Sequence, residues 1–109
     1  MFLSLSLFPP SLRFQPQDED GYTAFFWAAY YGHAEVVKLL LTEGNAEVDK
    51  SDNDGVTPLY TAVQNGKTEV VKLLLRGGAD ANIKTNAGHK PLAIAKSKGH
   101  QAIVALLEQ

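Results

Sequence analysis

Apolar residues recur with the spacing of an amphipathic helix in two closely similar stretches of the chain. Their apolar positions are Val36, Val37, Leu39, Leu40 and Leu41, and Val70, Val71, Leu73, Leu74 and Leu75. Apolar residues three and four positions apart form one stripe along a helix, so each stretch predicts a helix with one buried face. We expect these helices to end at Gly44 and Gly78, because glycine readily takes the conformation that terminates a helix.

The same pattern returns at a fixed interval. Two series of glycines mark it, with steps of 34 and then 33 residues: Gly21, Gly55 and Gly88, and Gly32, Gly66 and Gly99. The extra residue in the first interval is Asn45, because GNAEVDKSD aligns with GADANIKTN once that residue is treated as an insertion. A period near 33 residues indicates stacked units, none of which buries its apolar face alone.

Each unit also contains a shorter helix before the apolar one. Pro58 and Pro91 suit a first helical turn, where a missing N–H is tolerated, and Thr57 is a candidate N-cap. These first helices run for about eight residues and end at the second series of glycines. Between units, the runs DNDG and TNAG are typical of tight turns, which predicts short hairpin-like loops.

With these features the chain resembles the ankyrin-repeat family. The residues that carry the motif in the second copy are Gly55, Thr57, Pro58, Leu59, Ala62, Gly66, Val70, Val71, Leu73, Leu74, Leu75, Gly78, Ala79, Asp80 and Asn82. The resemblance covers 18–109 and implies an all-α solenoid of three helix–turn–helix units with short hairpin-like loops. We place the repeats at 18–51, 52–84 and 85–109, after an irregular N-terminal leader at 1–17.

The chain departs from the family motif in informative places. The motif's histidine is replaced by Phe26, Tyr60 and Ala93, which removes hydrogen bonds worth about 1 kcal/mol each. Lys96 and Lys98, on the first helix of the third repeat, suit a terminal unit that faces solvent. The N-terminal end has no comparable feature. Either the leader folds over the first repeat, or the chain is a fragment of a larger ankyrin-repeat protein whose activity lies elsewhere.

Composition narrows the function classes. The 109 residues suffice for one small domain, and the net charge of −2 supplies no overall basic field for nucleic acid. There is no cysteine, which excludes disulfides, thiolate metal sites and a cysteine nucleophile. No apolar run approaches the roughly 20 residues that cross a bilayer. We therefore expect a cytoplasmic or nuclear monomer that binds neither membrane nor nucleic acid.

Neither a metal site nor a catalytic site is expected. His33 and His100 occupy the same position in repeats one and three, about 20 Å apart if helix layers pack 8–10 Å apart, and His89 lies in a loop. That separation is far beyond metal–ligand distances. No nucleophile, base and orienting residue converge in the repeat geometry. We predict a protein that is not an enzyme and needs no cofactor.

The family resemblance implies binding of another protein through a concave surface of loop tips and first helices. The positions that correspond to this surface are Glu19, Asp20, Tyr22, Tyr30, Tyr31, Asn53, Asp54, Val56, Gln64, Asn65, Asn86, His89 and Lys98. Tyrosine is enriched in binding hot spots, so the three tyrosines are the expected anchors. The alternative is that Tyr30 and Tyr31 shield the open end of the stack.

Charge is distributed unevenly along the repeats. Residues 18–54 carry nine acids and two bases, whereas residues 55–109 carry three acids and seven bases. Acidic loop tips at one end predict a partner with a basic segment. The alternative is that the charges only keep the solenoid soluble. The run LLLRGGADAN also resembles the context in which ankyrin asparagines are hydroxylated, with Asn82 as the acceptor.

Overall fold

The computed structural model describes residues 23–43 and 48–109 of the chain. The helices in these ranges are α3 (Ala24–Tyr31), α4 (Ala34–Glu43), α5 (Pro58–Gln64), α6 (Thr68–Arg76), α7 (Pro91–Lys98) and α8 (Gln101–Leu107). These two ranges contain no strand. The predicted leader at 1–17, Gly44 and the inserted Asn45 lie outside the described residues. The predicted all-α class is confirmed.

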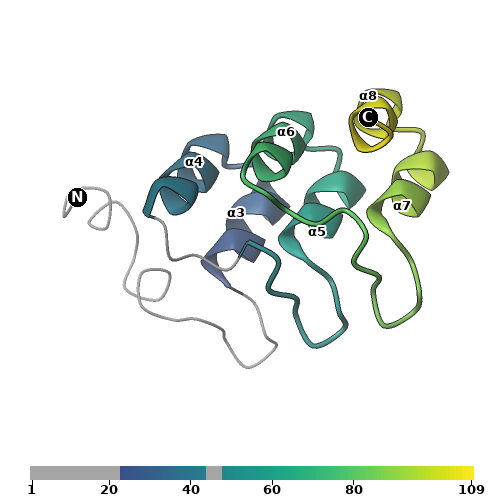
Figure 1. The fold of residues 1–109 in the computed structure, drawn as a ribbon, viewed down its shortest axis with the longest axis horizontal. Coiled ribbons are helices and arrows are strands. Elements are labelled where there is room, and N and C mark those ends of the chain that lie inside the picture. The colour runs from purple at the N-terminus through teal and green to yellow at the C-terminus, as the bar shows by residue number, and fades with distance from the viewer. Residues whose placement is uncertain (1–22, 44–47) are drawn as a thin grey trace.

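The helices form three antiparallel pairs stacked side by side (Figure 1). We refer to α3 with α4 as unit one, α5 with α6 as unit two, and α7 with α8 as unit three. The first helices α3, α5 and α7 make one layer, and the second helices α4, α6 and α8 make the other. The loops that precede α5 and α7 protrude beyond the first-helix layer. This is the predicted solenoid of helix–turn–helix units.

Threonine side chains begin the first helices of units one and two. Thr23 Oγ1 accepts from the Phe26 N–H and Thr57 Oγ1 from the Tyr60 N–H, both at 3.1 Å. Each bond satisfies one of the N–H groups that a helix start leaves without an intrahelical partner. Pro58 and Pro91 lie in the first turns of α5 and α7, as predicted. Lys90 holds the N-cap position of α7 and makes no side-chain capping bond.

The turns between paired helices bring consecutive units into contact. Gly32, Gly66 and Gly99 have φ values of 75°, 70° and 74°, the left-handed conformation expected for them. A Cβ on Gly32 would lie 2.8 Å from Lys67 Cδ, and one on Gly66 would lie 3.1 Å from His100 Cε1. Lys67 and His100, which follow the turn glycines of units two and three, therefore pack on the turn of the unit before them, which leaves no room for a side chain at Gly32 or Gly66.

The core lies between the two helix layers and between units. Its most buried side chains come mainly from unit two, and they include Leu59, Val63, Val70, Val71 and Leu74. Equivalent apolar residues at both ends of the stack, such as Leu40 and Leu107, are only partly buried. The central unit is more buried because it has a neighbour on both sides, whereas each end unit has one among the described residues.

Asp52 organises the hairpin loop at 52–56. Its Oδ1 accepts from the N–H groups of Asp54 at 2.8 Å and Val56 at 2.9 Å, and its own N–H donates to the Val56 carbonyl. Thr85 holds the same position in the hairpin at 85–89. There the Thr85 N–H donates to the His89 carbonyl, while Thr85 Oγ1 accepts from the His89 N–H at 3.3 Å. The predicted hairpin-like loops are therefore present between units one and two and between units two and three.

Polar bonds also connect neighbouring units. Asn86 reaches the preceding hairpin twice, because its N–H donates to the Asp54 carbonyl at 2.9 Å and its Nδ2 to the Asn53 carbonyl at 3.0 Å. Near the other end of the first helices, Asn65 Nδ2 donates to the Tyr30 carbonyl at 3.2 Å. These bonds fix the position of each hairpin and first helix relative to the one before it.

Unit three presents a polar face at the C-terminal side of the stack. Lys96 takes the position of Ala29 and Val63, which are completely buried against the next unit. Glu108 takes the position of Leu41 and Leu75. Lys96 Nζ and Glu108 Oε2 lie 3.6 Å apart and both side chains are exposed. An ion pair therefore stands where units one and two present apolar side chains.

Candidate partner-binding surface

Two rows of exposed side chains cross the first-helix layer, with one member from each unit. One row is Tyr30, Gln64 and Ser97, and the adjacent row is Tyr31, Asn65 and Lys98. Every residue in both rows is exposed. Because equivalent positions lie at the same place on successive stacked helices, the rows form one continuous surface, which we call the first-helix surface. All six are positions at which the family resemblance places surface contacts, Ser97 included.

Aromatic rings gather at the unit-one end of this surface. Tyr30 is 42% exposed and Tyr31 57% exposed, and they are the exposed large apolar side chains among the described residues. Their ring centroids lie 5.0 Å apart at an interplanar angle of 71°. Trp27 stacks on Tyr31 at 5.9 Å and 19°, and Phe26 stacks on Tyr30 at 6.2 Å and 26°. Each tyrosine therefore packs against another ring, Phe26 or Trp27, and remains partly exposed to solvent.

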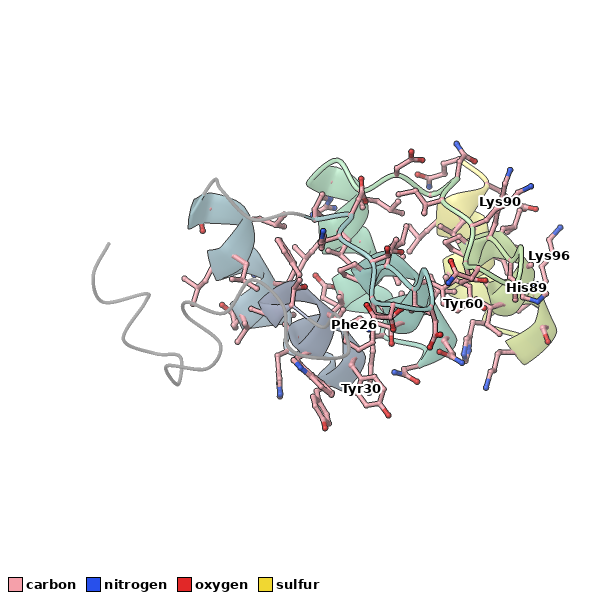
Figure 2. The ribbon with its side chains drawn as sticks, turned by 90° about the horizontal axis from the view of Figure 1, so that it is seen from below. Phe26, Tyr30, Tyr60, His89, Lys90 and Lys96 are labelled. Atoms are coloured by element: carbon pink, nitrogen blue, oxygen red, sulfur yellow. The ribbon has the colours of Figure 1, made fainter. Side chains whose placement is uncertain are left out.

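The hairpin tips supply the other described part of the predicted surface. Asn53, Asp54, Asn86 and His89 are exposed, and Val56 is partly buried. Asn86 makes the two hydrogen bonds to the preceding hairpin described above, so this exposed residue also has a structural role. Figure 2 shows His89 near Lys90 at the unit-three end, with Tyr60 between them and Tyr30. The predicted residues Glu19, Asp20 and Tyr22 lie outside the described residues.

Several acids in the acidic half of the chain have structural partners. Glu35 lies 3.5 Å from Lys38 on the same helix, and Asp49 Oδ1 accepts from the Asp80 N–H at 3.0 Å. Asp52 is buried and accepts two backbone bonds. Asp54, in contrast, is exposed at a hairpin tip. Three of the acids that suggested a basic partner therefore already interact with groups of this chain.

Two lysines at the unit-three end were not among the predicted site residues. Lys90 and Lys96 are exposed at the start and near the end of α7, at the opposite end of the first-helix row from Tyr30 (Figure 2). Together with Lys98 they place three cations on or beside one eight-residue helix. The surplus of bases after Gly55 could have indicated them, but that count does not show which of the bases lie on or beside one helix.

The histidines do not form a shared site. His33 is exposed and stacks on Tyr31 at 5.9 Å, whereas His100 packs over Gly66 in the joint between units two and three. Within residues 23–43 and 48–109, no group of three or more His, Cys, Asp or Glu side chains is arranged to hold a metal ion. None of the helices in these ranges has the length and apolar character of a membrane span.

Asn82 is exposed in the loop after α6, where a modifying enzyme could reach it. Its N–H donates to Asp80 Oδ1 at 2.8 Å, and the Asp80 N–H is in turn bound by Asp49 of unit one. Hydroxylation of Asn82 stays a prediction. An increase of one oxygen in the intact mass after treatment with an asparaginyl hydroxylase would support it, and an unchanged mass would contradict it.

The comparisons with known proteins identify the family. Residues 5–85 match the family model described as ankyrin repeats in three copies, and this range is more than half of the chain. The match begins within the predicted leader and ends before α7, although the structure contains a third helix pair after it. No curated protein matches the chain. Ankyrin repeats are generally protein–protein interaction modules. The sequence match and the stacked helix pairs show that this chain belongs to the ankyrin-repeat family.

Proposed function

We propose that this chain is a non-catalytic module that binds a partner protein through its first-helix surface and hairpin tips. The observation that carries the proposal is the pair of exposed tyrosines, Tyr30 and Tyr31, held in place by a stacked array of rings. Tyrosine supplies a large contact area and a hydroxyl, and it loses little conformational entropy when its ring is already ordered. Shielding of the open end of the stack is the competing explanation for the same pair.

The rest of the surface supports recognition by a rigid scaffold. The hydrogen bonds from Asn65 and Asn86 hold neighbouring units in register, so a partner need not order them on binding. An ordinary specific complex buries about 800 Å² on each partner, and we expect the interface with this chain to be of that order. In this proposal the chain acts as a monomer in the cytoplasm or nucleus.

A basic segment of the partner is a further part of the proposal. Among the described acids, Asp54 is the one exposed at a hairpin tip, and Glu19 and Asp20 occupy the corresponding part of the first repeat in sequence. Charges at such positions act mainly on association rate. Raising the salt concentration should slow the association of a captured partner. An association rate unaffected by salt would contradict the basic segment.

The proposal is tested by quantitative affinity capture with matched variants. The test variant changes Tyr30 and Tyr31 to alanine, and the control changes Glu69 and Lys72 to alanine, since these are exposed on α6 in the other helix layer. Circular dichroism would establish that both variants remain folded. Partners lost with the tyrosine variant and retained with the control would support the surface. Retention of every partner by the tyrosine variant would contradict it and favour a shielding role.

A further inference from the structure

The chemistry of the first-helix surface changes steadily from one end to the other. Both of its rows begin with a tyrosine in unit one and continue with an amide, Gln64 or Asn65, in unit two. In unit three the rows end with Ser97 and Lys98. The three units are built on the same backbone pattern, so this gradient comes from side-chain identity alone. A ligand that lies across all three units therefore meets an apolar end, a neutral polar centre and a cationic end.

The tyrosine end suits an apolar side chain. Trp27 stacks on Tyr31, and Tyr31 stacks on His33, so that three rings form a continuous array beside Tyr30. Rings held in this way present preformed faces, and covering them removes apolar area from water. The aliphatic part of the Lys67 side chain lies against Gly32, directly after Tyr31, and so adds apolar atoms from unit two next to the turn that follows the rings.

The lysine end suits carboxylates. Lys90, Lys96 and Lys98 are all exposed, and the ion pair that the structure shows for them is that of Lys96 with Glu108. Asp49 and Asp52 are hydrogen-bonded to backbone N–H groups within the stack, and α7 itself carries Lys96 and Lys98 in its last turn and no acid. The charge on and beside α7 is therefore net positive even when Glu108 is counted, and it acts on a ligand within a screening length of about 8 Å.

We propose that the first-helix surface takes an extended partner segment with an apolar residue on Tyr30 and Tyr31 and carboxylates on the lysines of unit three. This inference rests on the proposed function and names the chemistry of the partner for the same surface. With the first helices of neighbouring units about 8–10 Å apart, α3 and α7 lie about 20 Å apart, a distance that an extended chain covers in about six residues. The exposed Gln64 lies beneath the middle of such a segment, where its amide can bond the peptide backbone.

Rings beside lysines also occur in proteins that bind nucleic acid, but the charge distribution here favours a protein segment. Residues 18–54 carry nine acids against two bases, and the exposed ones among the described acids of this range are Glu35 and Asp54. A nucleic acid that stacked its bases on the tyrosines would bring its phosphates to a chain with a net charge of −2, so repulsion would replace the counterion release that drives such binding. A segment that is acidic at only one end avoids this repulsion.

The test uses three synthetic peptides and the ¹⁵N-labelled full chain. The first peptide carries a phenylalanine and a block of three glutamates separated by six Gly/Ser residues. The second has the same composition with a two-residue separation, and the third replaces the phenylalanine with serine. Backbone amide shifts report which units each peptide touches, and titrations at low salt give the dissociation constants. A single-stranded oligonucleotide serves as the nucleic-acid probe.

The first peptide is expected to shift amides of both α3 and α7 and to bind at least fivefold more tightly than the other two. Tyr30→Ala and Lys98→Gln should each weaken it about threefold, which is the scale of one exposed contact. Lys72→Gln on α6 is the matched control and should leave its affinity unchanged.

Equal affinities for the three peptides, shifts confined to one end, or tighter binding of the oligonucleotide would each overturn the inference. Partner capture that still depends on Tyr30 and Tyr31 would then keep the proposed function intact. Loss of that dependence would remove both, so the two failures are distinguishable.

Discussion

Units one and three have the same helix pair and the same turn glycine, yet they present opposite chemistry at the two ends of the stack. At the N-terminal side, Tyr31 and His33 are exposed at positions where Asn65 and Lys67 contact the preceding unit. At the C-terminal side, Lys96 and Glu108 form an ion pair at positions where unit two uses Val63 and Leu75. One end is aromatic and the other is ionic.

This difference shows that a few side chains decide whether a face of a repeat stacks or meets water. The backbone of unit three repeats that of unit one closely, with φ values of 74° and 75° at the equivalent turn glycines. Burial of apolar area drives stacking of the units. Charged side chains at the same positions remove this favourable term, because water solvates an exposed ion pair well. The following substitutions test how far the units differ, from the largest expected effect to the smallest.

Leucine-to-alanine substitution at one equivalent position in all three units should separate the centre from the ends. Leu74→Ala removes a fully buried side chain from α6 and should lower the free energy of unfolding by about 3 kcal/mol. Leu40→Ala and Leu107→Ala affect partly buried side chains and should cost about half as much. Urea unfolding of the three variants measures this. Equal losses at all three positions would contradict the gradient of burial.

The two hairpins should differ in their dependence on the residue that organises each of them. Asp52→Ala removes a buried carboxylate that accepts two backbone bonds, and it should cost about 2 kcal/mol. Thr85→Ala removes one longer bond to the His89 N–H and should cost about 0.5 kcal/mol. Chemical denaturation gives both values. A cost for Thr85→Ala as large as that for Asp52→Ala would show that the hairpins are equivalent.

Substitutions at two helix N-caps should change the free energy of unfolding in opposite directions. Thr57→Ala removes the bond to the Tyr60 N–H and should cost about 1 kcal/mol. Lys90→Thr introduces a capping hydroxyl at the start of α7, which has none, and should add about 0.5 kcal/mol. The shift of the urea midpoint at constant slope measures both changes. If Lys90→Thr destabilises the chain, the N-cap geometry of α7 differs from that of α5.

The ion pair at the C-terminal face should contribute least. Glu108→Gln breaks the contact with Lys96, but both side chains are about half exposed, so the loss should be about 0.3 kcal/mol. The difference from wild type should shrink further at high salt because exposed charges are screened. Thermal unfolding at two ionic strengths measures it. A loss above about 1 kcal/mol that persists at high salt would mean that Glu108 packs as well as pairs.

The sequence was sufficient for features that depend on neighbours along the chain. The period, the turn glycines Gly32, Gly66 and Gly99, and the Thr57 cap were all predicted and are confirmed. Each depends on local backbone conformation, which residue type controls directly. The predicted length of about eight residues for the first helices also agrees with α3, α5 and α7.

Contacts between distant residues were not predicted. Asp49 with Asp80 and Asn86 with Asn53 join residues more than 30 positions apart, so they depend on the distance between stacked units. The ring array at Trp27, Tyr31 and His33 required the orientations of side chains on two consecutive elements. Of the predicted site, the residues on the first helices and the two described hairpins are exposed or partly buried. Their use in binding stays a prediction.

The double link from Asn86 to the carbonyls of Asn53 and Asp54 has a consequence for selectivity. Because the backbone and the side chain of one residue both donate to the previous tip, moving the two hairpins apart would break both hydrogen bonds. The hydrogen bonds therefore set the spacing between the two hairpin tips. If the hairpin tips bind a partner as proposed, a ligand whose contact groups repeat at the spacing of the tips would engage both at once, and one with an insertion between the groups would engage a single tip.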